Sequence, residues 1–248
     1  MSNLDRDIHA GREPHGKEDA ADALAIGLQH HASQAYEEAL EWLQRAAAGG
    51  SSAAQFHLGR MIRRGEGVLA DIGEAANWYI KAALGGHPRA QCALGILYKT
   101  GEGVTQDDGL AARWLAEAAG HGVVAAQYHL GLMYLEGRGV PRDDAQAYTW
   151  LRRAAEQGHG AAQYQVGALL RDGRGTLQDV AEAVAWLRRS ADQGCAAAQD
   201  AVGELYTRRA GVSPDDDAAA DWWRKTLARS LARPDPGFTV DDDDIDPI

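Results

Sequence analysis

A strict internal repeat of 36 residues constrains the fold of this chain more than any other feature. A glutamine, a glycine and a tryptophan each recur at this spacing with no insertion or deletion between copies. A fixed period of this length is typical of one supersecondary unit stacked along an axis. A solenoid of this kind offers an extended surface rather than a closed catalytic pocket. The repeated positions are Gln55, Gln91, Gln127, Gln163 and Gln199; Gly59, Gly95, Gly131, Gly167 and Gly203; and Trp42, Trp78, Trp114, Trp150, Trp186 and Trp222.

The copy at residues 126–158 shows what one unit contains. Apolar residues at helical spacing predict a first helix, with Gly131 in its interior. Glycine costs about 1 kcal/mol relative to alanine there. Its return in every copy therefore predicts that a neighbouring helix crosses at this point and leaves no room for a Cβ. The pair Gly137 and Gly139 then predicts a left-handed C-cap and a tight turn.

The second half of the unit is predicted to be another helix. Asp143 and Asp144 stand at its start, where acidic residues complement the positive helix terminus. We interpret Trp150 as a core residue that fills the gap between layers. Histidines recur near the turn between units, where we expect a turn or capping role rather than catalysis; they are His87, His121 and His159.

This pattern resembles the Sel-1-like repeat family, a relative of the tetratricopeptide repeat. The match covers about residues 53–230 in five copies. The resemblance implies an all-α fold, a right-handed α-α superhelical solenoid of helix pairs. In one copy the matching residues are Ala90, Leu94, Gly95, Tyr98, Gly101, Gly103 and Val104, then Ala111, Trp114, Ala118, Ala119 and Gly122.

The predicted solenoid spans residues 20–231. It starts with a short tetratricopeptide-like unit at 20–52, which lacks the glycine pair, and continues with five repeats of 36 residues. Residues 1–19 are expected to form a flexible segment, and residues 232–248 an acidic flexible tail. Asp241–Asp244 in this tail are a candidate pseudo-ligand for the basic end of a binding groove, either that of their own molecule or that of a neighbouring one.

The charge of the chain excludes several functions. A formal net charge of -11 argues against binding nucleic acids or anionic membranes, whose phosphates attract Lys and Arg. No secretory leader or membrane-spanning apolar run is visible, and Cys92 and Cys195 are expected to be free thiols. We therefore expect a cytoplasmic protein, and the predominance of Arg over Lys, together with the family, favours a bacterial one.

No pattern of catalytic or cofactor-binding residues stands out. The glycine pairs follow helices rather than strands and lack the Lys-Ser/Thr of a phosphate-binding loop. There is no metal-ligand spacing, no nucleophile elbow and no plausible Ser/His/Asp set. Some related proteins with a regular cysteine pair in each repeat are described as binding or hydrolysing β-lactams, but this chain lacks those pairs. We predict no enzyme activity and no cofactor, with a β-lactam-binding or hydrolase-like enzyme as a weak alternative.

The resemblance places the binding groove on the first helix of each unit. Residues around the crossing glycine vary from copy to copy while the frame stays fixed, as expected of a binding face on a repeated scaffold. Cations gather towards its N-terminal end, and tyrosine is enriched at interaction hot spots. The alternative is a solvated face whose cations pair with local acids. The candidate partner-binding residues are Phe56, Arg60, Arg63, Arg64, Arg89, Lys99, Tyr128, Tyr164 and Arg171.

These observations predict a non-catalytic scaffold or adaptor that binds a protein segment in its groove. An acidic segment or a C-terminal carboxylate would complement the cations. A dedicated inhibitor or immunity-type protein that masks one target is the main alternative, and a self-assembling structural role is a further one. The oligomeric state stays open.

Overall fold

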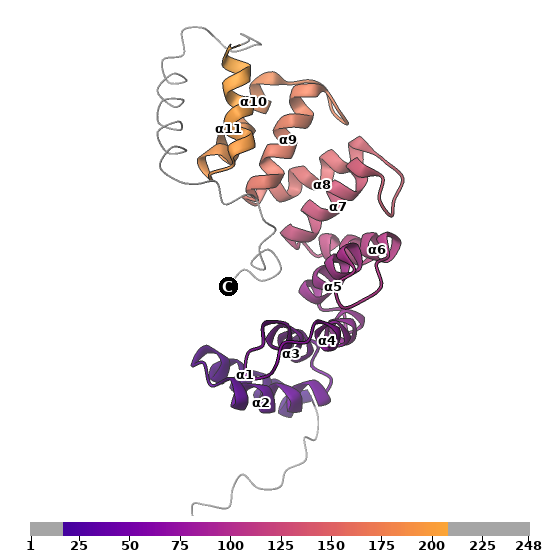
Figure 1. The fold of residues 1–248 in the computed structure, drawn as a ribbon, viewed down its shortest axis with the longest axis vertical. Coiled ribbons are helices and arrows are strands. Elements are labelled where there is room, and N and C mark those ends of the chain that lie inside the picture. Colours follow the sequence, from indigo (N-terminus) through magenta and orange to yellow (C-terminus); the bar gives the residue numbers. More distant parts are fainter. Residues whose placement is uncertain (1–16, 208–248) are drawn as a thin grey trace, which may run out of the picture. The chain divides into compact units, whose positions relative to one another are not determined.

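The computed structural model describes residues 17–207, and every regular element in this range is an α-helix (Figure 1). The predicted all-α class of consecutive helix pairs is confirmed. The segment before Lys17, the predicted second helix of the last copy and the acidic tail lie outside the described residues. The helices are α1 (Lys17–Ala32), α2 (Tyr36–Ala48), α3 (Ser52–Arg64), α4 (Ile72–Leu84), α5 (Pro88–Thr100), α6 (Asp108–Gly120), α7 (Val124–Glu136), α8 (Asp144–Glu156), α9 (Gly160–Asp172), α10 (Val180–Asp192) and α11 (Ala196–Thr207).

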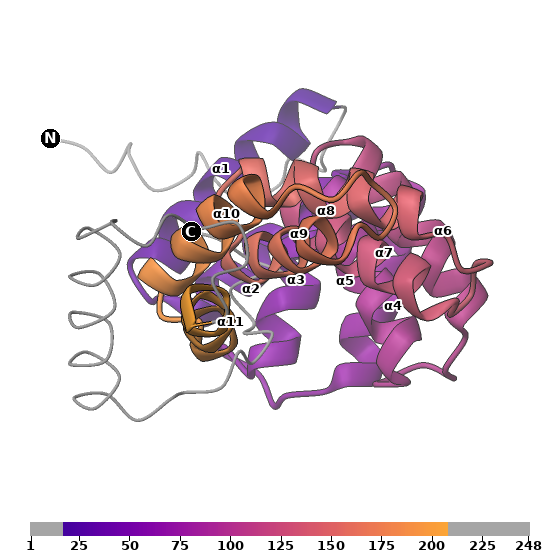
Figure 2. The same ribbon diagram turned by 90° about the horizontal axis from the view of Figure 1, so that it is seen from above.

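The chain divides into two compact units, residues 1–106 and 107–248. In the first unit, each helix from α1 to α5 packs against the next one in the sequence. The helices from α6 to α11 do the same in the second unit (Figure 2). Helix α1 already begins at Lys17, inside the segment that the sequence analysis expected to be flexible.

The crossing glycines lie where two helices touch. A Cβ on Gly59 would come within 2.8 Å of the Tyr79 ring, and one on Gly131 within 2.6 Å of Leu151 Cγ. Both side chains belong to the second helix of the same pair. Such contacts are far inside van der Waals distance, so only glycine lets the two helices pack this closely. The predicted close crossing is confirmed.

The two glycines of each turn have different roles. Gly137 caps α7 in the left-handed conformation, with φ of 69°, as predicted. Gly139 has the same φ, but a Cβ there would also overlap the backbone carbonyl of Asp108 at the start of α6. The second glycine therefore allows the turn to lie directly on the preceding helix pair.

Side chains cap the N-termini of seven of the nine helices α2–α10. Asp71, Asp107, Asp143 and Asp179 accept hydrogen bonds from backbone N–H groups at the start of the second helices. Histidines perform the same task on two of the first helices. His87 Nδ1 accepts from the Ala90 N–H at 3.2 Å, and His159 Nδ1 accepts from the Ala162 N–H at 3.1 Å. His121 instead stands at the C-terminus of α6.

The repeated glutamine links successive helix pairs. Gln127 is buried, and its Nε2 donates to the Ala119 carbonyl at the end of α6, at 3.3 Å. Its Oε1 accepts from Gln157 Nε2 at 2.8 Å. One amide thus satisfies a helix-terminal carbonyl and a neighbouring side chain, which explains the invariance of this position. The same bond to a carbonyl eight residues earlier is made by Gln55, Gln91, Gln163 and Gln199.

The interpretation of the tryptophans needs correction. Among the described tryptophans only Trp186 is buried, at 6% exposure, and the others are half-buried. In four copies a cation three residues further along the helix lies over the indole ring, as Lys81 does over Trp78 at 4.1 Å. These tryptophans therefore lie at the edge of the core, shielded by the stem of a Lys or Arg. The other three pairs are Trp42 with Arg45, Trp150 with Arg153 and Trp186 with Arg189.

Both cysteines, Cys92 and Cys195, are buried free thiols. None of the helices between residues 17 and 207 is long and apolar enough to cross a bilayer.

Candidate protein-binding surface

Three arginines share one face of α3. Arg60, Arg63 and Arg64 are spaced i, i+3 and i+4, so their side chains lie beside one another along the helix. Arg60 and Arg63 are half-buried and Arg64 is exposed. The helix itself carries no acidic residue.

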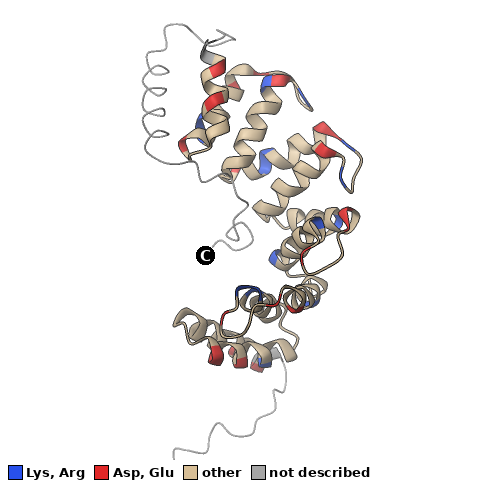
Figure 3. Ribbon diagram, viewed as in Figure 1, with Lys and Arg blue, Asp and Glu red and all other residues tan. Residues whose placement is uncertain are grey.

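Helix α5 adds two more cations and no acid, Arg89 in its first turn and Lys99 in its last. The ring of Phe56 on α3 stacks on His87, the N-cap of α5, with centroids 4.6 Å apart. The N-terminus of α5 therefore lies beside α3 at Phe56, which precedes Arg60 by one helical turn. We call this set the α3/α5 cation surface; it consists of Arg60, Arg63, Arg64, Arg89 and Lys99. Figure 3 marks Lys and Arg in blue and Asp and Glu in red along the described helices.

An acidic side chain beside this surface is engaged elsewhere. Glu66, in the turn after α3, lies 3.8 Å from Arg64 but makes a much shorter bond of 2.7 Å to His31 of α1. Glu66 therefore ties the first helix pair to the second and also forms an ion pair with Arg64.

His87 lies under the cation surface without adding to its charge. Burial, with a smaller effect from the charge of Arg89, lowers the pKa of His87 to about 4. The imidazole is therefore neutral near pH 7, and its Nδ1 remains free of a proton to accept the capping bond from Ala90.

The prediction that Phe56 anchors a partner is wrong. Its side chain is 1% exposed and lies between the rings of His87 and Tyr79. The residue three positions before the crossing glycine faces the next helix pair, so this side chain belongs to the core of the first unit.

The remaining predicted residues, Tyr128, Tyr164 and Arg171, belong to the second unit. Tyr128 is half-buried and stacks on His159, with centroids 4.4 Å apart. Arg171 donates to both carboxylate oxygens of Asp172, at 2.7 and 3.1 Å. This pairing is the main cause of the raised pKa of Arg171. An external carboxylate would have to compete with Asp172 for this guanidinium.

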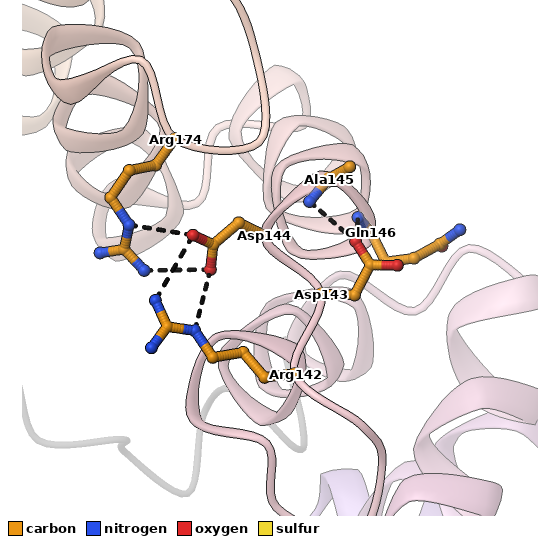
Figure 4. A network of polar contacts seen from close by, with 6 residues as sticks. All are labelled: Arg142, Asp143, Asp144, Ala145, Gln146 and Arg174. Carbon is orange, nitrogen blue, oxygen red and sulfur yellow. Dashed lines mark hydrogen bonds and ion pairs between the residues drawn. The ribbon is translucent and has the colours of Figure 1, made fainter.

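A second polar network was missed by the sequence analysis (Figure 4). Asp144 accepts bonds from Arg174 at 3.0 and 3.1 Å and weaker ones from Arg142 at 3.4 and 3.5 Å. Arg174, and then Arg142, lower the pKa of this carboxyl. Arg138 holds Asp108 in the same way, at 2.8 and 3.2 Å.

These ion pairs hold the two described glycine turns of the second unit against the preceding helix pair. The signal was present in the sequence, because each arginine between two turn glycines follows an aspartate by 30 residues. The first unit has Glu66 and Glu102 at the positions that correspond to Arg138 and Arg174, so its glycine turns lack this Arg–Asp ion pair.

Nothing in the described range resembles a metal centre. Among residues 17–207 no three His, Cys, Asp or Glu side chains gather in a way that could hold a metal ion. Together, the helix pairs define an α-solenoid in which α3 and α5 carry basic residues and no acidic ones.

Comparison with known proteins identifies this class more closely. The Sel1 repeat model matches six consecutive segments, and two solved structures at 30% identity or more share the fold. The chain therefore belongs to the Sel1 repeat family. The first matched segment is the short unit that the sequence analysis had described as tetratricopeptide-like. The matched residues are 21–51, 52–87, 88–123, 124–159, 160–195 and 196–229.

The two structures are bacterial proteins. One is a Sel1 repeat protein from Oxalobacter formigenes, which is 30% identical with a TM-score of 0.75 over 83% of this chain and 84% of that one. The other is c5321 of uropathogenic Escherichia coli, described as a protective antigen with an SLR fold. It is 31% identical with a TM-score of 0.78 over 85% of this chain. This chain spans 46% of the length of the E. coli protein. A search of curated proteins gave no match.

Proposed function

We propose that this protein is a non-catalytic scaffold or adaptor that binds an acidic segment of a partner protein over the α3/α5 cation surface. Sel1 repeat proteins generally mediate protein–protein interaction and are generally non-catalytic. The further step, to an acidic segment and to these residues, rests on the charges of the first unit.

The proposal rests on how charge is distributed among the first helices of successive repeat units. Helices α3 and α5 hold five cations and no acid, whereas α7 holds only Glu136 and α11 holds Asp200 and Glu204. The whole chain has a net charge of -11, so this surface opposes the overall sign. A local field of this kind favours the approach and correct orientation of an anionic partner.

Helix stability alone does not account for these cations. Arg63, Arg64 and Lys99 stand in the last turns of their helices, where the helix dipole favours positive charge. Arg89 stands in the first turn of α5, where the same dipole disfavours it. Arg60 lies in the middle of α3, where the dipole has little effect.

The side-chain types fit this ligand. Four of the five cations are arginines, whose planar guanidinium can donate two parallel hydrogen bonds to one carboxylate. Arginines spaced one turn apart on α3 can engage carboxylates that follow one another in an extended peptide.

A peptide-display selection tests the proposal. Random dodecamers selected on the immobilised full chain should become enriched in Asp and Glu. The variant with Arg60, Arg63 and Arg64 changed to Glu should lose this enrichment. A matched control with Arg45, Lys81 and Arg113 changed to Glu alters the total charge equally on exposed positions of second helices, and should retain it. Equal enrichment on both variants would remove the proposal.

The same partner measurements distinguish the alternatives. Several acidic partners with micromolar Kd support an adaptor, whereas one partner with a nanomolar Kd would indicate a dedicated inhibitor. Turnover of a β-lactam or another hydrolase substrate would contradict the non-catalytic assignment. We place this binding in the cytoplasm, because two free thiols fit a reducing compartment.

A further inference from the structure

The second helix α6 lacks the cation that covers the repeated tryptophan in the other described copies. In those four copies a Lys or Arg follows the tryptophan by three residues and lies 4.1–4.9 Å from the centre of its ring. In α6 the residue three positions after Trp114 is Glu117, so the charge at this place is reversed. Within residues 17–207, no cation lies over the Trp114 ring.

Trp114 and Glu117 form one small surface on α6. Their spacing of three residues makes them neighbours on the helix, where the indole is half-buried and the carboxylate is exposed. Arg113 is the nearest cation along the helix, and within residues 17–207 it makes no ion pair with Glu117. Glu117 also stands in the last turn of α6, where the helix dipole disfavours a carboxylate. Helix stability therefore does not account for an acid at this position.

We propose that Trp114 and Glu117 bind an arginine side chain of a partner protein, in the place where the other repeats hold a cation of their own. The guanidinium stacks on the indole face and donates two parallel hydrogen bonds to the Glu117 carboxylate. Arginine fits better than lysine, because its planar group can make both contacts at once. This site lies within the second unit and selects positive charge, so the inference does not depend on the proposed function.

One arginine on this site changes affinity by a modest factor. A cation over an exposed indole and an exposed ion pair together strengthen a protein interface about 3- to 30-fold in Kd. A free arginine derivative, which has no other contacts, should then bind with a Kd on the order of 10–100 mM. The site would thus determine which segment of a partner faces α6, rather than supply most of the affinity.

The test follows the indole N–H resonance of Trp114 by NMR on the full chain, with N-acetyl-arginine methylamide as the probe. The resonance is assigned as the one that is absent from Trp114→Phe. Adding the probe to about 200 mM at constant ionic strength should shift it along a saturation curve. The citrulline analogue has a similar shape without the charge, and should bind at least about 5-fold more weakly. Equal binding of both probes would overturn the recognition of a cation.

The substitution Glu117→Arg gives α6 the same pair of residues as the other repeats. The new side chain should cover Trp114 and weaken binding of the probe at least about 5-fold. The midpoint of thermal unfolding should stay within about 2 °C, because Glu117 is exposed. Glu41→Arg changes the total charge equally at an exposed position of α2, and should leave the binding at Trp114 unchanged. Undiminished binding in Glu117→Arg, or an equal loss in Glu41→Arg, would overturn the inference.

Two further outcomes decide what occupies the site. Sedimentation velocity over about 1–100 μM should give a constant monomer mass for the wild type. Self-association that Glu117→Arg abolishes would place an arginine of a second copy on Trp114 and overturn the assignment to a different protein. If the probe caused no saturable shift of the Trp114 resonance, the site itself would be refuted.

Discussion

Replacing Gly139 by alanine should destabilise the second unit much more than replacing Gly137, although both glycines have φ of 69°. The left-handed conformation costs a non-glycine residue about 1 kcal/mol. For Gly137→Ala this is the main cost, because the new Cβ would lie 3.3 Å from Arg142 Cβ, a contact that a shift of a few tenths of an ångström relieves. For Gly139→Ala the Cβ would overlap the Asp108 carbonyl, which is part of α6. Overpacking against a fixed group adds about 1–3 kcal/mol, so the total is about 2–4 kcal/mol.

Urea denaturation followed by far-UV circular dichroism measures this difference. With an m-value of about 3 kcal/mol/M, the midpoint should fall by roughly 0.3 M for Gly137→Ala and by roughly 1 M for Gly139→Ala. Gly158→Ala provides a control, because Gly158 has φ of 94° and nothing lies within 4 Å of its added Cβ. It should behave like Gly137→Ala. If Gly139→Ala cost no more than this control, close stacking of the turn on the preceding helix pair would be refuted.

Three other predictions concern single contacts. Lowering the pH from about 7 to 4.5 should reduce the free energy of unfolding of the wild type by about 1–2 kcal/mol more than that of His87→Asn. The sign follows because the pKa of His87 in the folded protein, about 4, lies below its ordinary value of 6.5, so the unfolded chain takes up the proton first as the pH falls. The same pH dependence for both proteins in urea titrations would contradict this prediction. A double-mutant cycle of Arg138→Gln and Asp108→Asn should give a coupling free energy of about 0.5–1 kcal/mol that decreases in 1 M salt. A coupling free energy that does not depend on salt would contradict an exposed ion pair. Gln127→Leu should cost about 1–3 kcal/mol in thermal or urea unfolding, because it strands a buried carbonyl, whereas Gln157→Ala should cost less than half as much at its exposed position.

The frame of the fold could be predicted from the sequence because each repeat copies the same physical requirement. A glycine that returns inside a helix, as Gly131 does, bears a cost that only a close crossing repays. Gly137 marks a helix end because few other residues adopt positive φ. The capping aspartates and His87 were found for the same reason, since a cap acts within three residues of its own position in the chain.

Features that depend on the neighbouring repeat were harder to predict. Phe56 and Arg60 are one helical turn apart, and the repeat pattern treats them alike. Only the structure shows that His87 covers Phe56 while Arg60 remains partly accessible. The bond between Arg138 and Asp108 likewise joins two repeats through a backbone turn whose path the spacing alone does not define. Burial and pairing across repeats depend on three-dimensional stacking rather than on local pattern.

The central claim is that the α3/α5 cation surface, rather than the chain as a whole, recognises acidic segments. The most direct measurement is the Kd of a labelled octapeptide of alternating Asp and Glu, determined at about 50 mM and 200 mM salt. Changing Arg60, Arg63 and Arg64 to Glu should weaken binding at least about 10-fold at the lower salt, and the wild-type affinity should fall as salt rises. The account is contradicted if the same loss follows from changing Arg45, Lys81 and Arg113 to Glu, or if the α3 variant binds as tightly as the wild type.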